Sequence, residues 1–96
     1  MIRHIVFFSA RNRGDLDAIH DGLMILSQIP HHSHFELGRN LQSDAISETP
    51  VDIVVYAEFR TEDDLAAYKA HPLYAEAIRL VRPLRETRIA ADFRTS

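Results

Sequence analysis

Residues 59–74, FRTEDDLAAYKAHPLY, decide the fold of this chain, because they hold a strand end, a capped helix and a helix break. Apolar residues alternate through residues 51–59, which predicts a strand leading into this stretch. Thr61 is followed by three acidic residues, a pattern typical of a helix start, since the hydroxyl can accept a backbone N–H and the acids suit the positive end of the helix dipole. Pro72 disfavours helical backbone at His71, so we predict a break there and a second short helix over 73–81.

Four more stretches complete the order of elements. Residues 2–8 form a strand with apolar side chains on both faces, and residues 16–29 carry one apolar stripe at helical spacing before Pro30. Residues 34–41 and 87–93 alternate as strands. The order β-α-β-β-α-β predicts an α+β, ferredoxin-like fold, in which a four-stranded antiparallel sheet carries its helices on one face. We expect residues 1–96 to form a single domain.

The two central strands of such a sheet carry apolar residues on both faces. Ile5 and Phe7 alternate with Val6 and Phe8 in the first strand, and residues 53–56 of the third strand are apolar throughout. Helices can cover only one face, so the other face needs a partner. The simplest partner is a second copy of the chain, which predicts a homodimer through the sheet face.

Composition narrows the possible partners further. The formal charge of −3 gives no electrostatic reason to bind nucleic acid or an anionic membrane. RNA-recognition domains share this topology, but their exposed aromatic and basic residues are not matched by Asp52, Val54, Tyr56 and Glu58 of the third strand. No long apolar run occurs and Met1 leads directly into a strand, so we expect a cytoplasmic protein with no membrane or nucleic-acid partner.

Four segments carry a resemblance to a known family: IRHIVFF at 2–8, FRTEDDL at 59–65, AYKAHP at 67–72 and ADF at 91–93. Together they resemble the stress-responsive A/B barrel domain (Dabb) family of the dimeric α+β barrel superfamily, over nearly the whole chain. The resemblance implies a homodimer whose two sheets close a dimeric α/β barrel with the helices outside. It also implies a small pocket between sheet and helices in each subunit, and most members have no known reaction.

Plant polyketide cyclases are the best-understood relatives, and they perform an aldol condensation without a cofactor. They use a strand histidine that matches His4 and a second histidine at the position of Tyr74. A first-helix tyrosine of the cyclase pocket corresponds to Gly22, and the tyrosine three residues before His-Pro is kept as Tyr68. Other barrel relatives are cofactor-free monooxygenases, although no feature of this sequence points to oxygen chemistry.

Residues and resemblance together define a candidate site. His4 is either a general base with a pKa near working pH or a buried neutral histidine held by hydrogen bonds. Tyr68 and Tyr74 are either phenol donors or core tyrosines, and His71 suits a helix end, where its ring can bond terminal carbonyls. The catalytic candidates are His4, Tyr68 and Tyr74. The predicted ligand-binding residues are His4, Val6, Phe8, Leu23, Tyr68, His71 and Tyr74.

Two clusters of side chains could be either binding sites or ordinary surface features. His32, His34 and Glu36 would share one strand face beside His31, but without a second cluster we favour incidental metal binding over a dedicated site. Four arginines recur at every third position: Arg79, Arg82, Arg85 and Arg88. They fit either phosphate binding or a solvated helix end matched to the dipole, which we prefer. We expect no metal and no cofactor.

Two functions remain open. The first, which we prefer, is a cofactor-free homodimer that binds a small apolar or aromatic ligand or is associated with stress. The second is a cofactor-independent lyase or polyketide-cyclase-like enzyme that uses His4 with Tyr68 or Tyr74.

Overall fold

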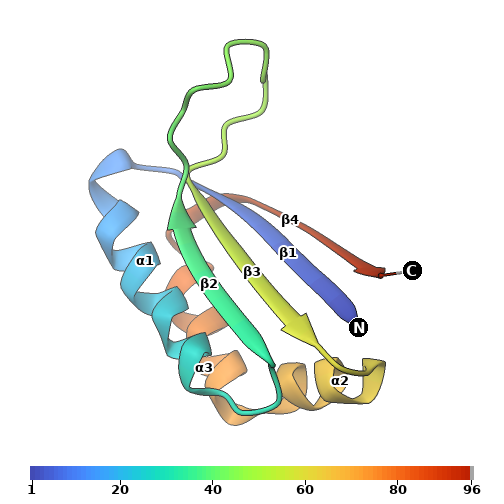
Figure 1. Ribbon diagram of the computed structural model, residues 1–96. Helices are drawn as coiled ribbons and strands as arrows, with labels where there is room; N and C mark the ends of the chain where they lie inside the picture. Colours follow the sequence, from blue (N-terminus) through green and yellow to red (C-terminus); the bar gives the residue numbers. More distant parts are fainter. Residues whose placement is uncertain (96) are drawn as a thin grey trace.

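A sheet with all of its helices on one face makes up the computed structural model, which describes residues 1–95 (Figure 1). The strands run antiparallel to their neighbours in the order β2-β3-β1-β4. Their bounds are β1 (Ile2–Ala10), β2 (His34–Arg39), β3 (Ile53–Phe59) and β4 (Arg85–Arg94). The predicted ferredoxin-like α+β fold is therefore confirmed.

The helix layer contains three α-helices and two short 3-10 helices. Their bounds are η1 (Arg13–Asp15), α1 (Leu16–Met24), η2 (Ile25–Gln28), α2 (Glu62–Ala70) and α3 (Pro72–Val81). Thr61 caps α2 as predicted, because its hydroxyl accepts the backbone N–H of Asp64 at 3.1 Å. The break also falls where Pro72 requires it, with His71 in an extended conformation. Within the described residues, no helix is long and apolar enough to cross a bilayer.

Some element bounds differ from those predicted. The first helix ends at Met24 and tightens into η2, while Ile29 lies outside both yet is only 1% exposed. The apolar spacing therefore predicted the burial of Ile29 correctly, but it predicted an α-helix that is too long. The second strand ends at Arg39, and Leu41 is 88% exposed in the connection to β3. Asn40 makes the last backbone bond toward β3, to the carbonyl of Asp52 at 2.8 Å, and its side chain bonds the carbonyl of Val51 at 2.6 Å.

The core lies between the sheet and the helices, and β1 supplies its centre. Ile2, His4, Val6 and Phe8 are all buried on the helix side, as the alternation predicts. Their neighbours in β3 and β4 are fixed by register: His4 lies between Ala57 and Asp92. The register therefore places a carboxylate of the last strand beside a histidine of the first.

A bulge in β4 changes which side chains face the helices. Phe8 is opposite Arg88 and Ser9 is opposite Thr87, but Ala10 is opposite Arg85, so Glu86 is the extra residue. Strand residues three apart normally lie on opposite faces, and the extra residue brings Arg85 and Arg88 to the same face. The end of β1 is fixed here by Asp52, a buried residue whose carboxylate accepts the N–H of Ala10 at 2.9 Å.

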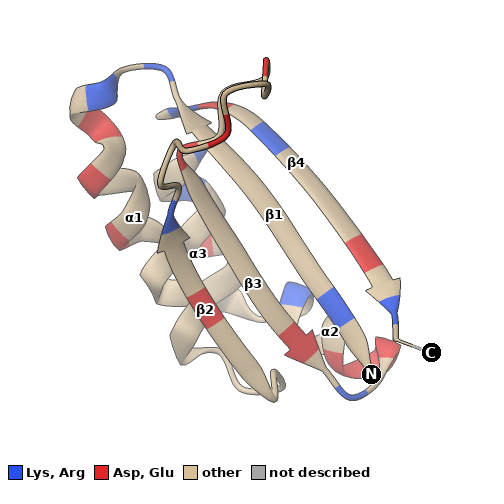
Figure 2. Ribbon diagram, turned by 45° about the horizontal axis from the view of Figure 1, so that its top comes forward, with Lys and Arg blue, Asp and Glu red and all other residues tan. Residues whose placement is uncertain are grey.

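The opposite face of the sheet is uncovered and largely apolar at its centre. Phe7 is 37% exposed, Ile89 49% and Phe93 48%, and register places them on this face. Figure 2 shows that charged residues on β1 and β3 are confined to one end of each strand. We call this surface the outer apolar patch; its members are Ile5, Phe7, Val54, Ile89, Ala91 and Phe93.

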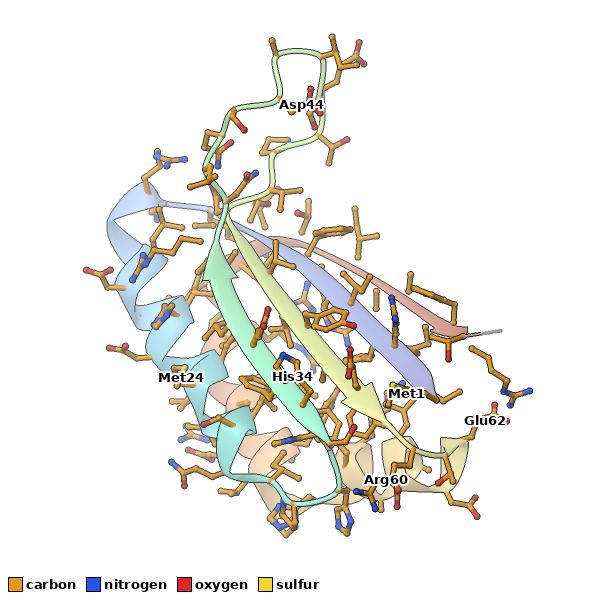
Figure 3. The ribbon with its side chains drawn as sticks, in the orientation of Figure 1. Met1, Met24, His34, Asp44, Arg60 and Glu62 are labelled. Atoms are coloured by element: carbon orange, nitrogen blue, oxygen red, sulfur yellow. The ribbon has the colours of Figure 1, made fainter. Side chains whose placement is uncertain are left out.

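We predict that the outer apolar patch joins two copies of the chain. Light scattering after gel filtration should give about twice the chain mass of 11.0 kDa. Val54→Asp should dissociate or unfold the dimer, because it would bury an unpaired carboxylate in the interface. Met24→Asp, on the outside of α1 and 40% exposed, is the control that should remain dimeric (Figure 3). A monomeric wild-type protein at micromolar concentration would contradict the prediction.

Candidate functional site

A cavity of about 280 Å³ lies between the sheet and the helix layer. It is lined by side chains from β1, β3, β4, η2 and all three α-helices. Most of the predicted ligand-binding residues meet here: His4, Val6, Phe8, Leu23, Tyr68 and Tyr74. Strand alternation and helical spacing thus bring together residues that are far apart in the sequence.

His71 is the predicted ligand-binding residue that lies outside the lining of this cavity. Its ring Nδ1 accepts the backbone N–H of Leu73 at 3.1 Å, so the ring caps the start of α3. The expectation that the ring bonds carbonyls at the end of the preceding helix is wrong. The extended backbone imposed by Pro72 directs the ring to the next helix, which begins one residue later.

Tyr68 is the most buried polar side chain of the cavity wall. The residue is 0% exposed, and its ring centroid lies 4.9 Å from that of Phe59, 5.4 Å from Tyr74 and 6.1 Å from His4. Its hydroxyl has no hydrogen-bond partner among residues 1–95. Burial raises the pKa of Tyr68 well above its usual value, so the group is a neutral donor at physiological pH. A buried hydroxyl without a partner costs about 1–3 kcal/mol, which a ligand that accepts its hydrogen bond would remove.

His4 is 1% exposed and contacts the carboxylate of Asp92 through Nδ1. A carboxylate accepts hydrogen bonds, so the proton of the neutral ring lies on Nδ1 and the lone pair on Nε2. Burial lowers the pKa of His4; Asp92 opposes this effect, and Lys69 and Arg88 reinforce it. The ring is therefore neutral near pH 7, and Nε2 is the ring atom left for a ligand.

Asp92 is a site residue that sequence reasoning missed. It was noted only as part of the segment at 91–93, although it holds the Nδ1 proton of His4 and also lies 3.6 Å from the ammonium of Lys69. The signal was present in the topology, because the first and last strands of this fold are antiparallel neighbours. Pairing Ile2 with Arg94 would have placed Asp92 opposite His4.

The arginines after α3 are also closer to the site than predicted. Arg82, Arg85 and Arg88 line the cavity, and Arg88 donates from Nη2 to the hydroxyl of Tyr74 at 3.2 Å. Arg79 instead forms an ion pair with Glu76 at 2.6 Å, outside the cavity lining. The expectation of a solvated helix end therefore holds for Arg79, but the other three arginines contribute to the cavity wall.

Gly22, which the resemblance matches to a first-helix tyrosine of the cyclases, lies where helix packing leaves little room for a side chain. A Cβ atom on Gly22 would lie 2.9 Å from Cγ2 of Val81, closer than real Cβ contacts come. α1 and α3 pack against each other at this point, and a larger side chain would push them apart.

The histidines at the start of β2 share the predicted strand face only in part. His34 lies on the uncovered sheet face, where Nε2 is 2.8 Å from the carboxylate of Glu36 (Figure 3). His32 precedes the strand, and its ring packs 5.4 Å from Phe35 and 6.3 Å from Tyr68. The predicted shared face is therefore right for His34 and Glu36 and wrong for His32, because β2 begins only at His34. In the part of the chain that the structure describes, no group of three or more metal-binding side chains occurs.

The chemistry available in the cavity follows from two neighbouring groups. The Tyr68 hydroxyl can donate a hydrogen bond, and Nε2 of His4 can accept one or take a proton. Both lie in a mainly apolar enclosure, where such interactions are stronger than in water. The arrangement suits a small molecule that carries a carbonyl or hydroxyl group.

Comparison with known proteins identifies related chains. The family model described as Stress Responsive A/B Barrel Domain matches residues 2–95. A dimeric ferredoxin-like protein of unknown function from Thermobifida fusca is 26% identical, with a TM-score of 0.77 over 96% of this chain and 88% of that one. A Dabb family protein from Mesorhizobium loti is 23% identical, with a TM-score of 0.81 over 99% of this chain and 96% of that one. No curated protein matches at a significant level.

Some structural neighbours have names that point to a reaction. An antibiotic biosynthesis monooxygenase shares 15% identity, with a TM-score of 0.79 over 100% of this chain and 99% of the other. At that identity the similarity shows the fold alone. The comparisons therefore establish family and architecture, and the chemistry has to be argued from the cavity.

We predict that His4 makes stability depend on pH. Its pKa in the folded protein lies below the unfolded value of about 6.5, so the unfolded chain binds more protons in this range. The free energy of unfolding should therefore decrease as the pH falls through about 6.5. The measurement is the melting temperature between about pH 8 and pH 5, with an NMR titration of the ring.

Variants show whether His4 is the cause of this pH dependence. His4→Gln should flatten the pH dependence, while His31→Gln, an exposed histidine outside the cavity lining, should keep it. Asp92→Asn should lower the pKa of His4 further, because it removes the charge that favours the imidazolium. A His4 ring that titrates above 6.5 in the wild type would refute the burial effect.

Proposed function

The chain belongs to the stress-responsive A/B barrel domain family, and from that premise we propose that it is a cytoplasmic homodimer that binds a small aromatic or apolar molecule without a cofactor. One observation carries the proposal: Tyr68, whose buried hydroxyl has no hydrogen-bond partner within residues 1–95, lines the cavity beside a neutral histidine. A structural core would be expected to pair or exclude such a group. In a binding site, by contrast, the hydroxyl has to stay available for a hydrogen bond to the ligand.

The dimer is supported by two independent features. The outer apolar patch exposes Phe7, Ile89 and Phe93 on a face that no helix covers. The 26% identical protein from Thermobifida fusca, which has the same fold, is described as dimeric. A second copy on this face would leave the cavity on the helix side of each sheet, so each subunit would hold its own site.

The size of the cavity limits the ligand. A cavity of roughly 150 Å³ is sufficient for benzene, and this one measures about 280 Å³. One aromatic ring with short substituents therefore fits. The rings of Tyr68 and Tyr74 offer it edge or face contacts, and the polar pair of Tyr68 and His4 orients an oxygen on it.

We predict that 4-ethylphenol binds in the cavity and raises the melting temperature of the dimer. Its hydroxyl can accept from Tyr68 and donate to Nε2 of His4, and a concentration of about 100 times the Kd should stabilise the fold by about 2.7 kcal/mol. Tyr68→Phe should reduce the shift while leaving the unliganded protein as stable or more stable, because it removes the unpaired hydroxyl. Calorimetry should report the same loss as a weaker affinity.

Two controls locate the binding. Ala77→Leu adds volume to the cavity wall and should reduce the shift, whereas Tyr56→Phe, on the uncovered face, should leave it unchanged. A shift that survives both Tyr68→Phe and Ala77→Leu would place the binding elsewhere and contradict the proposal.

A second candidate function is supported by the contact between His4 and Asp92. That contact leaves an unprotonated Nε2, which is the requirement for a general base. A proton next to a carbonyl would move to Nε2, the electron pair would pass to the carbonyl oxygen, and the Tyr68 hydroxyl would stabilise the resulting enolate. This is the chemistry of a cofactor-independent lyase or cyclase-like enzyme, with Tyr74 held beside the site by Arg88.

Hydrogen–deuterium exchange separates the enzyme from the binding protein. An enzyme should speed exchange of the α-protons of phenylacetone in D₂O, measured by NMR, with a rate that falls at pH below the pKa of His4. His4→Ala should abolish the acceleration and Asp92→Asn should reduce it, while His31→Gln should leave it intact. Exchange at the buffer rate in the wild type would reject this candidate.

A further inference from the structure

We propose that the ligand of this cavity carries a carboxylate on its apolar body, and that Arg82, Arg85 and Arg88 bind the carboxylate. The inference rests on the proposed binding function and adds the chemical class of the ligand. It starts from a contrast in charge. The chain as a whole has a formal charge of −3, yet the charged residues that line the cavity are three arginines, with no aspartate or glutamate among them.

Ion pairing separates these arginines from most others in the chain. Carboxylates pair with Arg11, Arg13, Arg39, Arg79 and Arg94. Arg82, Arg85 and Arg88 form no ion pair with a carboxylate in residues 1–95. Three guanidinium groups therefore share one cavity wall without a counter-charge from the described chain.

Two separate features of the backbone, the end of α3 and the bulge in β4, place Arg82 and Arg85 at the cavity. Arg82 is the C-cap residue of α3, and its backbone N–H bonds the carbonyl of Ile78. Arg85 faces the helices only because the bulge makes Glu86 the extra residue. A regular ladder would put Glu86 opposite Ala10, and so would turn a carboxylate toward the cavity. Glu86 instead lies 3.5 Å from Arg11.

The three arginines repel one another, and a bound anion would relieve this repulsion. Burial lowers the pKa of Arg85, and the neighbouring Arg82, Arg88 and Arg11 act in the same direction. Guanidinium groups remain charged at neutral pH, so the repulsion persists without a ligand. Their planar donors match the two oxygens of a carboxylate, and Arg88 is already oriented by its bond to Tyr74.

The arginines lie close to the polar pair of the proposed binding function, which limits the shape of the ligand. Arg88 bonds the hydroxyl of Tyr74 at 3.2 Å, and the ring of Tyr74 lies 5.4 Å from that of Tyr68. The charge of Arg88 also contributes to the lowered pKa of His4. The ligand is therefore compact, with a short apolar body between the carboxylate and the oxygen that faces His4 and Tyr68.

The experiment compares two probes of nearly the same size and shape, one charged and one neutral: 3-phenylpropanoate and 3-phenylpropanamide. Calorimetry on the wild-type dimer at neutral pH should show the carboxylate binding about 10-fold or more tightly than the amide, since charge-assisted hydrogen bonds are stronger than neutral ones. The difference should shrink between about 0.05 M and about 0.5 M salt, because salt screens the ionic part. Inorganic phosphate, which lacks the apolar body, should bind more weakly than 3-phenylpropanoate.

The variants assign the preference to the arginines. Arg85→Gln combined with Arg88→Gln should bring the ratio of the two affinities close to one. Arg88→Gln alone, at an exposed position, should reduce it and serves if the double variant does not fold. Arg79→Gln removes an arginine that pairs with Glu76 outside the cavity lining, and should keep the wild-type ratio.

The outcomes also separate this inference from the proposed function. Equal affinity for both probes would overturn the carboxylate inference and leave the binding function intact. A preference that persists in the arginine variants, or phosphate that binds as tightly as 3-phenylpropanoate, would also overturn it. Failure of both probes and of 4-ethylphenol to bind the folded dimer would overturn the binding function and the inference together.

Discussion

The structure depends on one constraint: β1 is apolar on both faces, while the helices can cover only one. The covered face holds His4 and Val6 in the core, and the uncovered face exposes Phe7. Burying the first face requires the helix layer, and burying the second requires another molecule. A single strand therefore links the core, the position of the histidine and the surface available for association.

Polar groups in the cavity are organised by the partners of that strand. β4 lies along β1, so it supplies Asp92 to the ring of His4 at one level and Arg88 at another. α2 places Tyr68 against the same ring. The polar groups of the cavity thus come from β1, β4, α2 and α3 and lie close to one another. No single element supplies them all, so the site exists only when sheet and helix layer are assembled.

Local patterns were sufficient to predict the fold, because alternation, capping and the break at Pro72 are all properties of neighbouring residues. The resemblance to the Dabb family, added to these patterns, grouped His4, Tyr68 and Tyr74 at one candidate site. The patterns could not reveal that Arg85 and Arg88 share a face, since residues three apart on a strand diverge unless a bulge intervenes. Asp92 was missed for a different reason: its contact with His4 spans 88 positions and depends on strand register.

The unpaired hydroxyl of Tyr68 has a consequence for the amount of protein in a cell. A cost of about 1–3 kcal/mol is a large part of the 5–15 kcal/mol that usually separates folded from unfolded domains. Differences of about 1–2 kcal/mol change abundance several-fold, because unfolded chains are removed by proteases. A ligand that accepts this hydrogen bond would therefore protect the chain from degradation, so the level of the protein would follow the supply of its ligand.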